Sequence, residues 1–229
     1  MNPGAGLDVC EAAPDPWLQS LPASLRQWLL GTARPVALRA GQRLFARGDQ
    51  PDGLYGITAG QMRFTGITET GQEAILAICE APQWFGEIAL FDNEPRTHDA
   101  WAQTDATLRH VPQFALDELL SQQPAHWRHF GRLLTHKLRV SFVAMEGLVL
   151  LPPTPRVAGR LALMATGHGA LDRGGARVLK VSQEQLAQML ALSRQTVNQA
   201  LKELEATGAI RRSRAAIEVL DLAALRSAA

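Results

Sequence analysis

Cysteine is almost absent from this 229-residue chain, in which only Cys10 and Cys79 occur. Two thiols cannot build a disulfide framework or a four-thiolate metal site within one chain, so we interpret both as reduced thiols. The sequence also lacks a run of about 18 apolar residues, which argues against a helix that crosses a bilayer. Its first residues, MNPGAGLDVCEAAPDP, lack the basic start and the apolar stretch of a signal peptide. We therefore expect a cytoplasmic protein with no membrane partner.

The chain also lacks an excess of positive or negative residues, since its net charge is only +1. The two parts of the chain nevertheless differ. Residues 152–229 hold 11 Lys+Arg against 6 Asp+Glu, a net charge of +5, and residues 1–151 hold 12 against 16, a net charge of −4. The hydrophobic content of 46% excludes a disordered chain. Because nucleic acids are polyanions, we expect the basic C-terminal part to be the one that binds DNA.

Strand patterns separated by glycines dominate residues 35–116. Short runs rich in Val, Ile, Leu, Phe and Thr, such as QMRFTGIT and ATLRHV, predict a compact antiparallel β-barrel or sandwich. Before them, LPASLRQWLL at residues 21–30 predicts a short helix that ends at Gly31. The first 16 residues have no periodicity, and we expect a mobile tail over residues 1–20.

One long helical pattern without internal proline covers residues 125–151. Its apolar residues recur at heptad spacing, which predicts a seam against a second helix and favours self-dimerisation. The alternative is that the seam packs on the chain's own barrel. The predicted dimerisation residues are Trp127, Leu134, Leu138, Ser141, Met145 and Leu148.

Pro152 and Pro153 interrupt the helical pattern, and we expect a hinge there. Thr154 is the predicted N-cap of the next helix, with Pro155 in its first position. The rest of the sequence predicts a helix up to Ala165, a glycine-rich loop with a strand, two helices and a final pair of strands.

The segment SQEQLAQMLALSRQTVNQALKELEATGAI has the layout of a helix-turn-helix followed by a wing. A capping box at Ser182 begins its first helix, and Ser193 caps its second. The polar face of the second helix carries an arginine and amides, which read guanine and adenine edges in the major groove, and the wing arginines hold phosphates. The alternative is an ordinary helix with a solvated polar face. The predicted DNA-binding residues are Ser182, Ser193, Arg194, Gln195, Thr196, Asn198, Gln199, Lys202, Arg211, Arg212 and Arg214.

After residue 20 the chain resembles the CRP/FNR family of bacterial transcription regulators over nearly its whole length. GEIALFDNEPRT is similar to the phosphate-binding cassette of the family, and LSRQTVNQALKELEATGAI is similar to its recognition helix. The resemblance implies an α+β fold in which an N-terminal antiparallel β-roll, like the jelly roll of cyclic-nucleotide-binding domains, precedes a winged helix-turn-helix. The implied domains are an effector-binding β-roll over residues 21–124, a dimerisation helix over 125–151 and a DNA-binding domain over 152–229.

The resemblance also implies roles for the cassette residues. In cyclic AMP-binding members the residue at the position of Glu87 takes the ribose 2′-hydroxyl, that of Arg96 pairs with the cyclic phosphate, and that of Thr97 donates to it. The alternative is a structural turn that holds an Arg–Glu ion pair. The expected effector-binding residues are Gly86, Glu87, Ile88, Ala89, Arg96, Thr97, His98, Ser141 and Phe142.

Two positions depart from the family pattern. His98 stands where the cassette has a small residue. Ser141 and Phe142 correspond to two hydroxyl residues that contact adenine across the dimer in cyclic AMP receptors, so only one hydroxyl is left. One interpretation is that Phe142 stacks on a base, and the one that we favour is that it fills the pocket. The effector is therefore left open between cyclic AMP, another cyclic nucleotide, cyclic di-GMP and no small ligand.

Other cofactors and activities are not expected. An iron–sulfur cluster needs a cysteine cluster that the chain does not have. Haem needs an axial ligand, and the candidates are lone histidines of a kind that is usually on the surface. These are His98, His126, His129 and His136. The sequence has no nucleophile elbow, paired-histidine metal motif or P-loop, so we do not expect an enzyme.

The function that we expect is that of a homodimeric, effector-gated regulator that binds a palindromic operator in double-stranded DNA and contacts RNA polymerase. A sensor that acts through protein contacts and a regulator without a ligand are the alternatives. In the cyclic AMP receptor the residues equivalent to Gln195 and Gln199 are an acid and an arginine. The two amides predict an operator shifted toward A·T at those steps. The sequence does not identify the effector, the target genes or whether the protein activates or represses.

Overall fold

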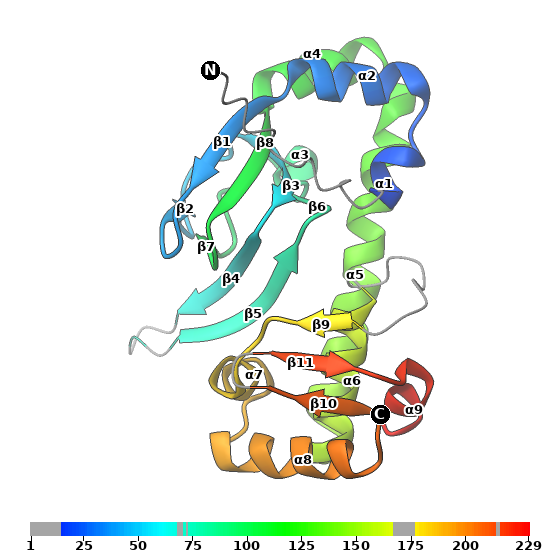
Figure 1. Cartoon of the computed structure of the whole chain (residues 1–229). Coiled ribbons are helices and arrows are strands. Elements are labelled where there is room, and N and C mark those ends of the chain that lie inside the picture. Colours follow the sequence, from blue (N-terminus) through cyan, green and yellow to red (C-terminus); the bar gives the residue numbers. More distant parts are fainter. Residues whose placement is uncertain (1–14, 68–70, 72, 167–176, 214–215) are drawn as a thin grey trace, which may run out of the picture.

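The computed structural model describes residues 15–67, 71, 73–166, 177–213 and 216–229. Figure 1 shows a β-roll at one end, a long helix that runs down one side, and a C-terminal domain of helices and a small sheet at the other end. This arrangement confirms the predicted α+β fold with an N-terminal antiparallel β-roll and a C-terminal helix-turn-helix domain.

The β-roll consists of two four-stranded antiparallel sheets, in the orders β1-β8-β3-β6 and β2-β7-β4-β5. The alternating apolar residues of these strands meet between the sheets, where Ile57, Met62, Phe64 and Leu108 are buried. The strands are β1 Arg34–Leu38, β2 Arg43–Phe45, β3 Gly53–Ala59, β4 Gln61–Ile67, β5 Glu73–Glu80, β6 Gln83–Phe85, β7 Asp99–Ala102 and β8 Ala106–Pro112.

Short helices and the upper part of the long helix cover one end of the roll (Figure 1). They enclose a second apolar core in which Leu25, Leu29, Leu116 and Phe130 are fully buried. The helices of this part are α1 Pro16–Gln19, α2 Ala23–Thr32, α3 Ala89–Asp92, α4 Gln113–Gln122, the 3₁₀-helix η1 Pro124–His126 and α5 Trp127–Leu150.

Two predictions for this part of the chain need correction. Helix α2 continues past Gly31, because this glycine does not take the left-handed conformation that ends a helix. Residues 16–19 form α1, in which Leu18 is buried, so the end of the predicted tail is packed. Residues 1–14 lie outside the described residues.

Trp127 is partly buried and packs against the core of its own roll, where its ring lies 5.2 Å from that of Phe91. Its assignment to the dimer seam stays a prediction.

The C-terminal domain packs four helices on a small antiparallel sheet of order β10-β11-β9. Leu161, Leu186, Val197 and Leu201 are buried at its centre because each lies on the apolar stripe of its helix. The elements are α6 Pro153–Ala165, β9 Arg177–Leu179, α7 Gln183–Leu190, α8 Arg194–Ala206, β10 Ile210–Arg212, β11 Ile217–Val219 and α9 Leu222–Ser227.

The break between α5 and α6 falls at the predicted hinge, but its cap differs from the prediction. Leu151 and Pro152 are extended, and α6 begins at Pro153. A proline is tolerated there because the first amides of a helix have no partner within the helix. Thr154 is therefore inside the helix, and its hydroxyl donates to a carboxylate oxygen of Glu203 at 2.6 Å instead of capping.

Strand β5 connects the two ends of the molecule. Its residues Ile75 and Ile78 belong to the same apolar cluster as Val157 and Leu161 of α6. The sheet β2-β7-β4-β5 of the roll is thus packed against the C-terminal domain through β5. None of the described helices has the length and apolar character needed to cross a membrane.

Candidate effector cavity and nucleic-acid interface

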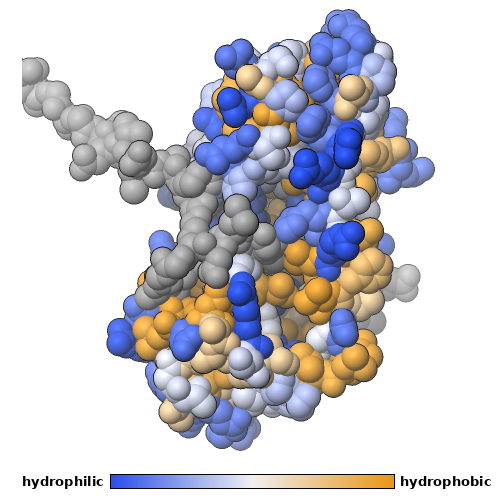
Figure 2. Space-filling view, turned by 90° about the vertical axis from the view of Figure 1, so that its right-hand side faces the viewer, coloured by the Kyte–Doolittle hydropathy of each residue, from blue (hydrophilic) through white to orange (hydrophobic). Residues whose placement is uncertain are grey.

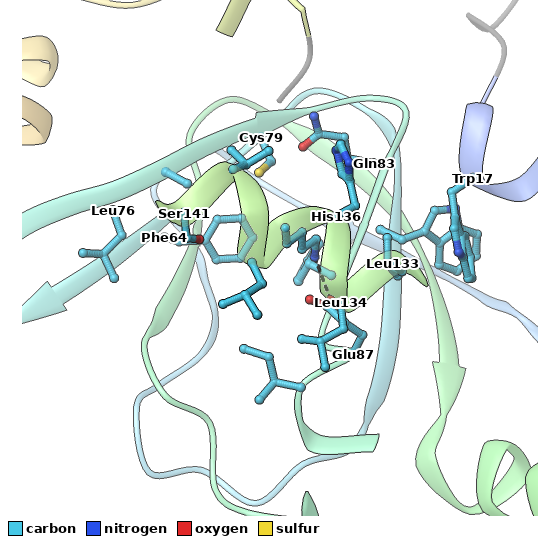
Figure 3. A pocket seen from close by; sticks show the side chains of 18 of the residues that line it. Trp17, Phe64, Leu76, Cys79, Gln83, Glu87, Leu133, Leu134, His136 and Ser141 are labelled. Carbon is cyan, nitrogen blue, oxygen red and sulfur yellow. Dashed lines mark hydrogen bonds and ion pairs between the residues drawn. The ribbon is translucent and has the colours of Figure 1, made fainter. Parts of the chain in front are cut away.

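A cavity of about 680 Å³ lies between the β-roll and α5. Figure 3 shows side chains of both elements around this space, Phe64, Leu76 and Cys79 from the roll and Leu134 and Ser141 from α5. Small-molecule sites have volumes of about 300–1,000 Å³ and combine apolar walls with a few polar groups. The cavity therefore has the size and lining of a site for a small organic ligand.

Arg96 is held at the wall of this cavity by a fixed set of acceptors. The residue is only 6% exposed. Its Nη2 donates to the Asp52 carboxylate at 2.5 Å and to the Gly53 carbonyl at 2.8 Å, and its Nη1 donates to the Gly86 carbonyl at 3.3 Å. The guanidinium also lies over the ring of Phe45 at 4.5 Å. Among the described residues its Nε has no hydrogen-bond partner, so one donor of this buried cation is unsatisfied.

Gly86 allows the backbone to pass close to this arginine. Its φ is +97°, and a Cβ atom there would lie 2.7 Å from the Gly53 carbonyl oxygen and 3.0 Å from Nη1 of Arg96. Both the conformation and the space exclude a side chain. The glycine at the start of GEIALFDNEPRT is therefore needed to bring the cassette against the arginine.

Glu87 points into the cavity and meets a cation from the long helix. It is 2% exposed, and its Oε2 accepts from Nζ of Lys137 at 2.7 Å. The dashed contact of Glu87 is visible in Figure 3. The Arg–Glu pair that the sequence left as an alternative is not formed, because Arg96 pairs with Asp52 and Glu87 pairs with Lys137.

Thr97 and His98 share a hydrogen bond of 2.7 Å between the hydroxyl and Nδ1. The imidazole lies edge-on to Phe64, with ring centroids 5.3 Å apart. Burial lowers the pKa of His98, and the charge of Lys137 lowers this pKa further. The ring is therefore neutral near pH 7 and adds no charge to the cavity.

Cys79 lies in the same wall and is half-buried. Burial raises its pKa to about 11, although the charges of Lys137 and Arg160 lower it. The thiol is therefore protonated at neutral pH and behaves as an apolar wall group.

The predicted effector residues line this cavity with one exception. Gly86, Ile88, Ala89 and Ser141 belong to its wall, as do the charged and hydroxyl residues of the cassette described above. Phe142 is not among the lining residues and is 60% exposed, so the expectation that it fills the pocket of its own chain is wrong. Consecutive helical residues point about 100° apart, and α5 turns Ser141 toward the cavity.

The candidate DNA-reading face lies on α8, at the end of the molecule away from the β-roll (Figure 1). Arg194, Gln195, Gln199 and Lys202 are exposed on it. Arg194 and Lys202 make no hydrogen bond or ion pair with any residue that the structure describes. The side chains at the N-terminal end of this helix are therefore available to a partner in a major groove.

The serines before the two helices are used as caps. Ser182 and Gln185 form the predicted capping box, with bonds of 3.1 and 2.8 Å. Ser193 accepts from the amide of Thr196 at 3.0 Å and also contacts its hydroxyl at 2.8 Å. These hydroxyls satisfy backbone amides in the first turns of α7 and α8.

Asn198 and Arg212 form a network that differs from the predicted roles. Arg212 donates to the Asn198 carbonyl oxygen at 3.1 Å and pairs with Glu205 at 2.7 Å. Gln183 donates to the same Asn198 oxygen at 3.5 Å. Because this oxygen already accepts two bonds, Asn198 has only its NH₂ group left for a base, and the adenine pairing with both groups is not available in this conformation.

The two wing arginines that the structure describes, Arg211 and Arg212, therefore differ in their contacts. Arg212 ties the wing to α8, whereas Arg211 pairs with Glu218 at 2.9 Å and has a side chain that is 67% exposed. Arg211 thus remains a candidate for phosphate contact. Arg214 lies outside the described residues.

Comparison with known proteins identifies both the β-roll and the C-terminal domain. Residues 35–123 match the cyclic nucleotide-binding domain, and residues 155–228 match the Crp-like helix-turn-helix domain. A CRP-like cAMP-activated global transcriptional regulator of Mycobacterium tuberculosis is 31% identical over 78% of this chain and 80% of its own length. The chain belongs to the CRP/FNR family. It is accordingly a DNA-binding transcription regulator, and its relatives in the family are regulators and not enzymes.

Solved structures of this family share the fold. FixK2 from Bradyrhizobium japonicum has a TM-score of 0.75 and 22% identity, with 86% of this chain and 96% of that chain covered. A CRP/FNR family regulator from Thermus thermophilus has a TM-score of 0.65 and 26% identity, with 85% and 97% covered. The β-roll, long helix and winged domain described above are thus an arrangement that occurs in the family.

Sequence reasoning missed two charged residues that line the cavity, Lys137 and Arg160, and a third, Asp52, which pairs with Arg96 but does not line it. Asp52 and Lys137 neutralise the two cassette side chains, and Arg160 reaches the cavity from α6. No local pattern marks them, since each is separated from its partner by more than 40 residues. Within the described segments no group of three or more His, Cys, Asp and Glu could hold a metal ion.

Proposed function

We propose that the chain is a homodimeric regulator whose DNA binding is gated by a small anionic effector of the cyclic-nucleotide type in the cavity. The observation that carries this proposal is the Nε of Arg96, a buried cationic donor at the cavity wall that has no partner among the described residues. The cAMP activation of the Mycobacterium tuberculosis relative supports cyclic AMP as the first nucleotide to test.

The charges of the cavity favour an anion. Arg96, Arg132, Lys137 and Arg160 line it against two carboxylates. Glu87 is already paired with Lys137, and Asp15 accepts from the indole N–H of Trp84 at 2.6 Å. The surplus of cations raises the affinity for phosphate, and the apolar walls suit a base and a sugar.

The ion pair between Glu87 and Lys137 offers a mechanism for gating. A ribose hydroxyl that binds Glu87 must share or displace Nζ of Lys137, which stands on α5. A ligand shifts a conformational equilibrium only through contacts that differ between the states, and this contact is such a difference. Effector binding would therefore change the position of α5 relative to the roll.

The lower part of α5 favours a second copy of the chain as partner. Leu138, Phe142, Met145 and Val149 are 51–74% exposed along it. Figure 2 shows apolar side chains gathered on this face of the molecule. Pairing of α5 with the α5 of a second copy would cover these residues and place two copies of α8 on a palindromic operator. RNA polymerase would then contact the outer surface of the dimer. Because it acts on DNA, we place the regulator in the cytoplasm.

Thermal unfolding with cyclic AMP, cyclic GMP, cyclic di-GMP and haem tests the effector proposal. A ligand at about 100 times its Kd stabilises the native state by about 2.7 kcal/mol, so a binding nucleotide must raise the Tm. We expect this rise in the wild type and not in Arg96→Gln. The exposed Arg39→Gln on the same domain is the matched control and should respond like the wild type.

A regulator without a ligand is the second candidate, because internal ion pairs already occupy both cassette side chains. If this candidate is right, no nucleotide raises the Tm, and the unliganded protein binds the operator. Equal responses of the wild type and Arg96→Gln would contradict the proposed role of the cassette.

A further inference from the structure

Arg160 is a buried cation that enters the effector cavity from the DNA-binding domain. It lies on α6, is 8% exposed and belongs to the cavity wall. Its Nη2 donates to the carbonyl oxygen of Leu76 on β5 at 2.9 Å. In the described part of the chain its Nε has no hydrogen-bond partner.

No carboxylate neutralises this guanidinium within the described segments. Burial lowers the pKa of Arg160, and the only group that favours its charged form is the thiol of Cys79, which is itself protonated at neutral pH. A buried charge with neither a counter-ion nor a full set of acceptors is strongly destabilising. A bound ligand anion would supply the counter-charge and the acceptor that Arg160 lacks.

The position of Arg160 separates it from the cassette. Arg96 and Lys137 belong to the roll and to α5, whereas Arg160 follows the hinge between α5 and α6. Its contact with Leu76 crosses 84 residues of sequence and joins the two domains. An anion bound by Arg160 would thus contact the DNA-binding domain directly.

We propose that Arg160 is an anion-binding residue of the effector cavity and that the effector carries two anionic groups, one for Arg96 and one for Arg160. This inference rests on the proposed function and specifies its ligand as a small organic molecule with two phosphate or phosphodiester groups. Such a ligand holds the roll and the DNA-binding domain together and makes the operator affinity depend on the ligand.

Isothermal titration with one-phosphate and two-phosphate probes tests this proposal. Cyclic AMP is the one-phosphate probe, and adenosine 3′,5′-bisphosphate and cyclic di-GMP are the two-phosphate probes. At least one two-phosphate probe should bind the wild type more tightly than cyclic AMP does. Arg160→Gln should weaken that probe about tenfold or more and change cyclic AMP by less than about twofold, because a charged hydrogen bond is lost only for the former.

Two variants keep the test independent of folding. Arg160→Lys retains the charge and should keep part of the affinity for the two-phosphate probe. Arg226→Gln makes the same charge change on an exposed site of α9 and should bind all probes like the wild type. Circular dichroism melts of each variant without ligand show whether a loss of binding reflects a loss of fold.

The outcomes separate this inference from the proposed function. If Arg96→Gln abolishes binding but Arg160→Gln weakens every probe equally or none, the cassette role stands and the role of Arg160 is wrong. If the wild type binds cyclic AMP and neither two-phosphate probe, the two-anion ligand is wrong. If the wild type binds no probe at all, both the inference and the proposed effector class are wrong.

Discussion

The cavity beside α5 and the exposed face of α8 both carry cations, and they hold those cations in opposite ways. Arg96 is buried and donates to a carboxylate and to two backbone carbonyls, and Lys137 is paired with Glu87. Arg194 and Lys202 are exposed on α8 and have no partner within the described chain. Water solvates an exposed charge, whereas a buried charge needs a protein partner or a ligand. The cations in the cavity are therefore held in place by the protein, whereas those on α8 are left to solvent.

Breaking the cavity pair should have the largest effect. Lys137→Met leaves Glu87, which is 2% exposed, without its counter-charge. Removing one partner of a buried pair costs about 3–5 kcal/mol, and the partial exposure of Lys137 reduces this to about 2 kcal/mol. Urea unfolding measures the loss.

The double variant Lys137→Met, Glu87→Gln is the control for this prediction. It should recover part of the stability, because no uncompensated charge remains at this pair. If Lys137→Met is as stable as the wild type, the pair is solvated and the contrast between the two regions fails.

On the exposed side, Arg194→Ala should weaken operator binding and leave stability unchanged. Loss of a guanine contact costs about 1–3 kcal/mol, or roughly 5- to 150-fold in Kd. Fluorescence anisotropy on operator and random duplexes measures the effect, which should be much smaller on random DNA. Arg226→Ala is the control with the same charge change. If sedimentation shows that Arg194→Ala loses the dimer, the residue packs and does not read bases.

The two wing arginines, Arg211 and Arg212, compare an exposed cation with one held by protein partners within the same hairpin. Arg211→Ala should lower the slope of log Kd against log salt by about 0.9, as expected when one phosphate contact is lost. Arg212→Ala should leave the slope unchanged, because this side chain binds Glu205 and Asn198. Equal changes in the two slopes would show that Arg212 leaves its network when DNA binds.

The smallest effect concerns His98 in the cavity. Its pKa is lowered by burial from an ordinary value of about 6.5, so between the two values the unfolded chain binds more protons than the folded one. The neutral ring contributes its full stability above about pH 6.5, and this contribution is lost as the pH falls through the unfolded value. His98→Gln should therefore lose less stability than the wild type between about pH 7.5 and about pH 5.5 in urea unfolding. A steeper loss in the variant would contradict the sign.

Local patterns in the sequence determined much of what the structure shows. The capping box at Ser182 involves groups three residues apart, and the apolar stripe of α8 repeats at helical spacing. Glycine spacing marked the turns of the roll, and the cassette identified Glu87 and Arg96 as cavity residues. Each of these signals is a property of a few neighbouring residues, and it needs no knowledge of the rest of the chain.

Tertiary structure alone decided how the charges pair. Arg96 meets Asp52 across 44 residues, Glu87 meets Lys137 across 50, and Arg160 meets Leu76 across 84. Such contacts depend on where the hinge directs α6 and on which turn of α5 faces the roll, and many partners are compatible with the same local pattern. The sequence by itself therefore determined the fold and the cassette. Burial in the folded chain selected which charges are neutralised, and it left the Nε donors of Arg96 and Arg160 without a partner among the described residues.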